Sequence, residues 1–181
     1  MSSTRGTALL GRIDFLKHKD RLDVLQNLSP KDKLAIEQAL PVGLYPITLK
    51  EKLDWTIATA LTPHDLDATY KELGRWSAES NFIQYHGMYL RPGDPHGMMA
   101  NGPAMHRRYY DSGEATYERT DSHSGVFSIH GVTEASWPDC LGTAGYWEKA
   151  VELSGGRYAS VSHTACVSKG APQCTFVVRW A

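Results

Sequence analysis

The sequence predicts an α+β protein in which N-terminal helices precede a ββ-α-ββ unit with a mainly antiparallel sheet. Two observations predict this class. Apolar residues recur at helical spacing through residues 1–61, whereas two later pairs of short segments alternate apolar and polar residues around turns. A helical pattern separates those two pairs. Helices segregated from antiparallel strands in this way are typical of an α+β domain.

The first segment, residues 1–61, is predicted to be helical throughout. Leucines at close to helical spacing over residues 9–28 predict one helix with a break in its middle. Ser29 and Pro30 begin the next, as N-cap and first-turn proline, and this helix is expected to stop before Pro41. A third amphipathic helix is predicted after that proline, because its leucines and isoleucine share one face.

The second segment, residues 62–181, carries the predicted sheet. A long helical pattern comes first, and a hairpin follows around the turn residues "DSHSG". Ser136 is an N-cap candidate with Asp139 three residues on, so a helix begins there and ends at Gly155. The segments "RYASVSHTAC" and "CTFVVRW" then predict the last two strands.

Composition excludes several classes of protein. The net charge of the 181 residues is -1, so there is no basic excess to attract nucleic acid or an anionic membrane surface. No apolar run approaches the roughly 20 residues that a membrane span needs, and the N-terminus lacks a signal-peptide core. A cytoplasmic location is therefore expected. The three cysteines are an odd number, which favours reduced thiols or a metal over a disulfide framework.

Four potential metal ligands lie in the last quarter of the chain: Cys140, His163, Cys166 and Cys174. Cys140 falls in the first turn of the predicted helix, where the helix dipole favours a thiolate. His163 and Cys166 are an odd number of residues apart and would face opposite sides of a regular strand, so a shared ion requires a bulge between them. Three thiolates and one imidazole fill a tetrahedral zinc shell. Inert buried thiols and a Cys166–Cys174 disulfide are the alternatives that spacing leaves open.

The spacing C-x22-H-x2-C-x7-C, with "AGYWEKAVELSGG" between and "CTFVVRW" closing, resembles the 4-vinyl reductase domain. That domain is also the sensory half of aromatic-responsive bacterial transcription activators, where Cys, Glu, Cys and Cys hold a structural zinc. His163 stands where that family has glutamate. The helical part, with "LYP" and "ELGRWSAE", is similar to an uncharacterised bacterial family that fuses such helices to this domain.

The resemblance implies a structural zinc, a homodimer and signalling through protein contacts. It also implies a non-enzymatic domain that senses a hydrophobic or aromatic ligand. The pocket is expected in the Met-rich and aromatic-rich middle of the chain, where adaptable apolar side chains gather. Its candidate ligand-binding residues are Phe82, Tyr85, Tyr89, Met98, Met99, His106 and Tyr109.

Other functions stay open. No nucleophile elbow, P-loop or HExxH motif is present, so no catalytic residue is predicted. The alternatives are an enzyme acting on a hydrophobic or tetrapyrrole-like substrate in the same pocket, and a ligand-free dimeric scaffold. The wider superfamily includes haem–nitric-oxide sensors, but the Tyr-x-Ser-x-Arg pattern that holds haem propionates is missing here, so haem ranks below zinc.

Overall fold

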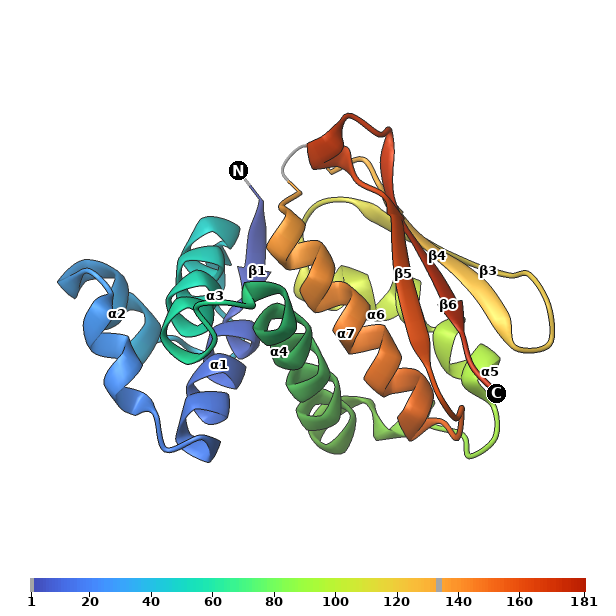
Figure 1. The fold of residues 1–181 in the computed structure, drawn as a ribbon, viewed down its shortest axis with the longest axis horizontal. Helices are drawn as coiled ribbons and strands as arrows, with labels where there is room; N and C mark the ends of the chain where they lie inside the picture. The colour runs from blue at the N-terminus through green and yellow to red at the C-terminus, as the bar shows by residue number, and fades with distance from the viewer. Residues whose placement is uncertain (1, 133–134) are drawn as a thin grey trace.

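A computed structural model describes residues 2–132 and 135–181 and confirms the predicted α+β class (Figure 1). The helices are α1 (Gly6–His18), α2 (Pro30–Glu37), α3 (Ile47–Leu61), α4 (Leu66–Asn81), α5 (Pro95–Met99), α6 (Gly102–Tyr109) and α7 (Trp137–Leu153). The strands are β1 (Ser3–Arg5), β2 (Leu44–Pro46), β3 (Glu114–Arg119), β4 (Ser124–His130), β5 (Ser160–Ala165) and β6 (Gln173–Arg179).

The N-terminal helices enclose a hydrophobic core of their own. It is built mainly from α1, α3 and a 3₁₀ turn at Leu22–Asn27, and α4 adds Leu73. Ser29 caps α2 by accepting a hydrogen bond from the Asp32 N–H, as predicted. The helix expected to reach Pro41 ends at Glu37 instead. The chain then turns into β2, which pairs antiparallel with β1, a small sheet that the helical pattern did not predict.

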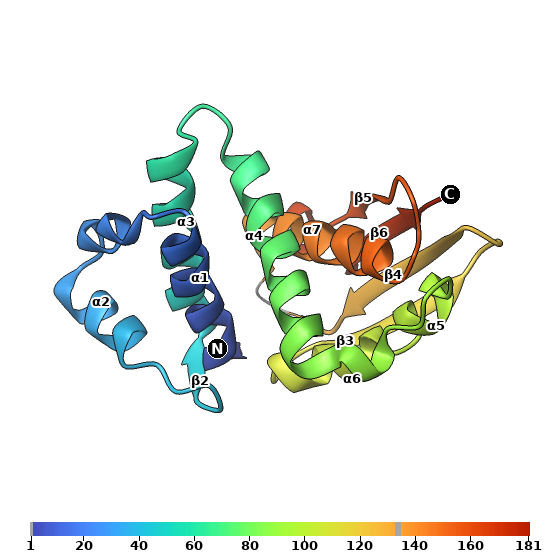
Figure 2. The same ribbon diagram turned by 90° about the horizontal axis from the view of Figure 1, so that it is seen from below.

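The main sheet has the order β3-β4-β6-β5, and all of its pairings are antiparallel. Helix α7, which connects the two hairpins in sequence, packs on one face of the sheet beside β5 and β6 (Figures 1 and 2). Phe127, Trp147 and Phe176 meet in the core between this helix and the sheet. The register of β5 against β6 shifts between His163 and Ala165. This irregularity is the bulge that a shared ligand set at His163 and Cys166 requires.

The middle helix α4 lies between the N-terminal helices and α7 (Figure 2). Glycines allow α4 and α7 to approach closely. A Cβ atom on Gly74 would collide with the carbonyl oxygen of Gly142, and one on Gly145 would collide with that of Lys71. Backbone therefore rests directly on backbone at this crossing, which fixes the spacing of the two helices.

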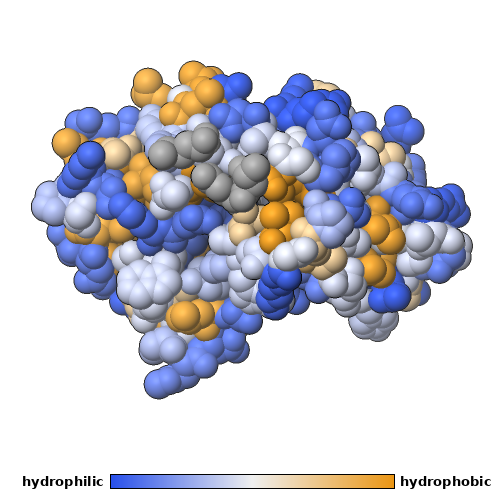
Figure 3. All heavy atoms as spheres, turned by 90° about the horizontal axis from the view of Figure 1, so that it is seen from above, coloured by the Kyte–Doolittle hydropathy of each residue, from blue (hydrophilic) through white to orange (hydrophobic). Residues whose placement is uncertain are grey.

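Between α4 and the sheet the chain is irregular. It passes through a single-turn π-helix at Phe82–His86, a 3₁₀ turn at Gly87–Tyr89, and the short helices α5 and α6. Within residues 2–132 and 135–181, no helix is both long and apolar enough to cross a membrane. On the face seen in Figure 3, hydrophobic side chains form separate groups within a mainly hydrophilic surface.

Candidate functional site

A cavity of about 250 Å³ lies where the N-terminal helices meet the sheet domain. Its wall combines Gly11 of α1, Ser77 of α4, His106 of α6 and Trp147 of α7, and Thr4 of β1 also contributes. Polar and apolar groups are mixed over this wall, and hydroxyl side chains come from several elements. Concave sites with a few converging polar groups are the usual places where small ligands and cofactors bind.

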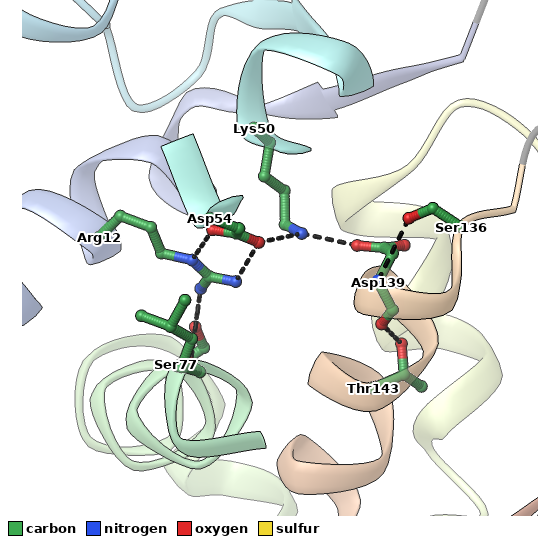
Figure 4. A network of polar contacts seen from close by, with 8 residues as sticks. Arg12, Lys50, Asp54, Ser77, Ser136, Asp139 and Thr143 are labelled. Carbon is green, nitrogen blue, oxygen red and sulfur yellow. Dashed lines mark hydrogen bonds and ion pairs between the residues drawn. The ribbon is translucent and has the colours of Figure 1, made fainter. Parts of the chain in front are cut away.

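Four charged side chains form a buried network beside the cavity (Figure 4). Arg12 donates two hydrogen bonds to the carboxylate of Asp54, at 2.7 and 3.2 Å, and also donates to the Ser77 hydroxyl. Lys50 lies between two carboxylates, 2.9 Å from Asp54 and 2.6 Å from Asp139. The network thereby joins α1, α3 and α4 to the first turn of α7.

The charges of this network balance one another. Burial alone would lower the pKa of Lys50, but the charges of Asp139 and Asp54 outweigh it, so the pKa is raised and the ammonium form is retained. Burial alone would raise the pKa of Asp54, yet Arg12 and Lys50 hold it below the ordinary value. Two cations thus face two anions, and the cavity has no unpaired charge from these four residues.

His106 is the imidazole of the cavity wall. Its Nε2 lies 3.2 Å from the carbonyl oxygen of Ser112, and its ring stacks on Tyr110 with centroids 5.0 Å apart. Burial lowers the pKa of His106, so the ring is neutral near pH 7. A neutral ring that donates from Nε2 to a carbonyl leaves Nδ1 unprotonated. Metal-ligating histidines typically have this arrangement, with one nitrogen hydrogen-bonded and the other free to ligate.

A hydrogen bond links the end of α4 to α6 near this histidine. The Nε2 of His86 lies 2.8 Å from the Tyr109 hydroxyl. Burial raises the pKa of Tyr109 to about 12, so the phenol stays protonated at neutral pH. Tyr109 and Tyr85 both line the cavity, and Tyr85 is also half-exposed to solvent. The wall of the cavity therefore reaches the protein surface at the end of α4.

Three of the seven predicted ligand-binding residues line this cavity: Tyr85, His106 and Tyr109. The other four do not. Met98 and Met99 are fully buried in the core beneath the sheet, as is Phe82, and Tyr89 packs against the same core. The Met-rich composition of the segment therefore reflects core packing as much as a pocket, because these side chains serve either purpose.

The four predicted metal ligands converge. The ligand atoms of Cys140, His163, Cys166 and Cys174 all lie within 4.8 Å of one another. The Cys140 sulfur is 3.8 Å from that of Cys166 and 3.7 Å from that of Cys174. The thiol of Cys140 and the Val167 N–H both donate towards Cys174, and these contacts lower the pKa of Cys174 to about 5.

The histidine of this cluster has no other role in the described structure. Both ring nitrogens of His163 are buried and lack a hydrogen-bond partner among the described residues. The ring is held in place by stacking on Phe176, with centroids 4.7 Å apart. A buried imidazole with two unsatisfied nitrogens is costly unless something binds it. The donor chemistry therefore fits a metal ion held by three sulfurs and one nitrogen.

Sequence reasoning missed the charged network and two hydroxyls in the cavity. The hydroxyls of Thr4 and Thr7 are buried without a partner in the described part of the chain. Lys50 and Asp54 did give a signal, because they carry opposite charges four residues apart within the apolar pattern of α3. Arg12 and Asp139 gave no signal in the sequence. Their partners, Asp54 and Lys50, lie on another helix that is distant in the chain.

The α+β architecture encloses a cavity of about 250 Å³ between the N-terminal helices and the sheet. No protein-family model matches the chain, and no curated protein matches it. Solved structures of H-NOX proteins do match over nearly the whole chain, and one of them comes from work on haem distortion in the H-NOX family.

Three of these structures illustrate the match. An Fe(II) unliganded H-NOX protein mutant from K. algicida superposes with a TM-score of 0.69 at 13% identity, covering 98% of this chain and 96% of the other. An H-NOX protein from S. oneidensis in the Fe(II)NO state gives 0.70 at 12% identity, with 98% and 99% covered. An oxygen-binding H-NOX domain related to soluble guanylate cyclases gives 0.67 at 9% identity, with 97% and 92% covered. At such identities the likeness shows a shared fold.

These structures overturn the resemblance to the 4-vinyl reductase domain. The prediction of a zinc-stabilised sensor for an aromatic ligand is therefore wrong. The prediction of zinc as the cofactor of the domain is also wrong, because the matching folds are those of haem proteins. The error has a physical origin. The ligand spacing covers only α7, β5 and β6, whereas the cavity wall also takes residues from β1, α1, α4 and α6.

Haem fits part of this site. His106 supplies a neutral imidazole in the cavity wall, and Met105, Phe127 and Phe176 supply apolar surface for a macrocycle. The site departs from a standard haem site in the groups that would bind the two haem propionates. Arg12 and Lys50, the cations in the cavity wall, are already paired with Asp54 and Asp139. The described residues thus offer an imidazole and a lined cavity, and both cations that line it are paired with carboxylates.

Proposed function

We propose that the chain is a haem-binding sensor domain for a diatomic gas, with His106 as the axial ligand. The observation that carries this proposal is a neutral imidazole in the wall of a ligand-sized cavity, within a fold shared with H-NOX proteins. Haem, when bound, supplies an iron with a coordination position open to a gas molecule. The protein would supply the ring of His106, oriented by Ser112 and Tyr110, and apolar surface from Met105, Phe127 and Phe176.

A haem titration tests the proposal. Adding haem to the purified protein should give a saturable Soret band at one haem per chain. His106→Gly should lose the spectrum of an imidazole-ligated haem, because the axial nitrogen is gone, and added imidazole should restore it. Haem dimethyl ester should bind with an affinity similar to that of haem, since the cations of the cavity are already paired.

His123→Ala is the matched control, because His123 does not line the cavity. It should bind haem with the wild-type spectrum. Absence of saturable haem binding in the wild-type chain would rule out the proposal. So would a His106→Gly variant whose haem spectrum is unchanged and insensitive to imidazole.

We further propose that Cys140, His163, Cys166 and Cys174 hold a structural metal ion at the edge of the cavity, whose wall includes Cys140 and Cys174. Two observations support this metal site: the four ligand atoms converge, and both ring nitrogens of His163 lack a hydrogen-bond partner among the described residues. Four protein ligands leave no open position, so the role of the ion is to fasten α7 to the terminal hairpin.

Cys174→Ser should remove most of the bound metal and lower the thermal midpoint, because structural metal binding contributes folding free energy. Metal content per chain, measured by plasma emission on protein purified without chelators, checks this. The neighbouring variant Gln173→Ala should keep the metal content of the wild type. A wild-type protein that carries no stoichiometric metal would contradict the assignment.

The remaining expectations extend the same proposal. We propose a homodimer, a division of the chain into a helical segment at residues 1–61 and an α+β domain at residues 62–181, and a cytoplasmic location. Three free thiols in mutual contact suit a reducing compartment, which supports the location. Sedimentation measurements on the purified chain would decide between monomer and dimer.

A further inference from the structure

Two hydroxyl groups near the start of the chain are buried without a hydrogen-bond partner. They belong to Thr4 of β1, which is 0% exposed, and to Thr7 in the first turn of α1. Neither hydroxyl has a partner among residues 2–132 and 135–181, and both residues line the cavity. A buried hydroxyl without a partner is unfavourable, and folded proteins keep few of them. The cavity wall therefore holds two hydrogen-bond donors that the described part of the fold leaves unused.

The strand that carries Thr4 has a fixed orientation. Thr4 pairs with β2 on one side and with Tyr110 on the other. Side chains alternate along a strand, so Thr4 and Arg5 point to opposite faces, and Arg5 does not line the cavity. Tyr110 stacks on His106, with ring centroids 5.0 Å apart. Thr4 therefore lies beside the part of the wall that carries the proposed axial imidazole.

The first turn of α1 makes the position of Thr7 electrostatically favourable for a ligand oxygen. The helix has 13 residues, and the positive end of its dipole lies at this turn. The turn, residues 6–9, contains no acidic side chain. Thr7 and Gly11 are four residues apart on one helix face, and both line the cavity. An oxygen atom with full or partial negative charge is therefore favoured at Thr7.

The two cations of the cavity wall are already engaged. Arg12 is paired with Asp54, and Lys50 lies between Asp54 and Asp139. Moving either cation to a ligand would leave a buried carboxylate without its partner, which is strongly unfavourable. A carboxyl group in this cavity would therefore be bound by neutral donors, and the two unpartnered hydroxyls are such donors.

We propose that the hydroxyls of Thr4 and Thr7 bind the carboxyl groups of the cavity ligand, which for haem are its propionates. This inference rests on the proposed function. A hydroxyl donates to a carboxylate, to a carboxylic acid and to an ester carbonyl alike, so it accounts for the similar binding expected of haem and haem dimethyl ester. The same hydroxyls lower the stability of the haem-free chain, because nothing in the described fold satisfies them.

Thermal unfolding of the haem-free chain tests this second consequence. Thr4→Val/Thr7→Val replaces each hydroxyl by a methyl group, and its thermal midpoint should be higher than that of the wild type. Thr69→Val is the matched control. Thr69 is also buried, but its hydroxyl bonds to Thr62 and it does not line the cavity. Thr69→Val should have a lower thermal midpoint and the haem affinity of the wild type.

Titration with three macrocycles tests the binding itself. Thr4→Val/Thr7→Val should bind haem and haem dimethyl ester about tenfold more weakly than the wild type, the loss expected for two hydrogen bonds of ordinary strength. Iron octaethylporphyrin has no carboxyl groups and should bind both chains equally. The spectrum of an imidazole-ligated haem should persist, because His106 is intact. Thr4→Ser/Thr7→Ser keeps both hydroxyls and should retain the haem affinity of the wild type.

Three results would overturn the assignment of these hydroxyls. They are undiminished haem binding by Thr4→Val/Thr7→Val, equal weakening of iron octaethylporphyrin, and a lower thermal midpoint of the haem-free variant. Each would leave haem ligation by His106 standing. A wild-type chain that binds no haem would instead overturn the proposed function and this inference together.

Discussion

Lys50→Met should lower the free energy of unfolding by about 3–5 kcal/mol, because it leaves Asp54 and Asp139 in the buried network without their shared cation. Methionine keeps most of the side-chain volume, so the loss reports charge and not packing. Urea unfolding followed by circular dichroism measures the difference. The side chains of Lys50 and Asp54 are only 5% and 7% exposed, so water cannot replace the missing partner.

The pH dependence of stability gives this prediction a second readout. The pKa of Asp54 is lowered in the folded state, so its contribution is present above about pH 3.9 and is lost as the pH falls through the folded value. The pKa of Lys50 is raised, so its contribution is present below about pH 10.4 and is lost as the pH rises through the folded value. Lys50→Met should remove the contribution of Lys50 to the alkaline loss and shift the acid loss to higher pH, because Asp54 then keeps only Arg12 as a cationic partner.

Lys71→Met is the matched control for charge removal. Lys71 pairs with Glu148 at 3.2 Å, but its side chain is 39% exposed, so the pair is screened by water. Its replacement should cost less than about 1 kcal/mol. Equal losses for the two variants would show that the buried network contributes no more than a surface ion pair.

Gly145→Ala should destabilise the protein by about 1–3 kcal/mol, the usual cost of overpacking a tight contact. The added methyl group would collide with the carbonyl oxygen of Lys71 in the facing helix. Backbone cannot move aside as a flexible side chain can, so α4 and α7 must separate. Thermal unfolding monitored by calorimetry measures the effect.

The same substitution at Gly11 should have the opposite effect on the free energy of unfolding. A Cβ atom on Gly11 meets nothing within 4 Å, because this residue faces the cavity from α1. Gly11→Ala should therefore stabilise the chain by about 1 kcal/mol, the difference in helix propensity between the two residues. Loss of stability in Gly11→Ala, or a neutral Gly145→Ala, would contradict this account of helix spacing.

Local signals predicted most of the secondary structure. Ser29 and Ser136 cap α2 and α7 as expected, because an N-cap acts within its own turn. The two hairpins and the helix between them also lie where the sequence predicted them. The pairing of β1 with β2 was missed, since three-residue strands leave no period to detect and their partners are about 40 residues apart.

The candidate sites differ in how much the sequence could reveal. The ligand atoms of Cys140, His163, Cys166 and Cys174 converge because one helix start and one hairpin bring them together. The cavity was not foreseen as a whole, since its wall combines residues from β1 to β6 and depends on how helices stack. The cofactor was assigned wrongly for the same reason, because a spacing pattern that includes only Cys140 and Cys174 of the cavity wall cannot report the rest of that wall.

Helix α4 belongs to both hydrophobic cores, giving Leu73 to the N-terminal one and Ala78 and Phe82 to the one beneath the sheet. Neither core can lose this helix without exposing part of the other. The chain should therefore melt in one cooperative transition, with equal calorimetric and van't Hoff enthalpies. Anything that binds in the cavity would then protect the whole molecule from unfolding by mass action, including regions it never touches.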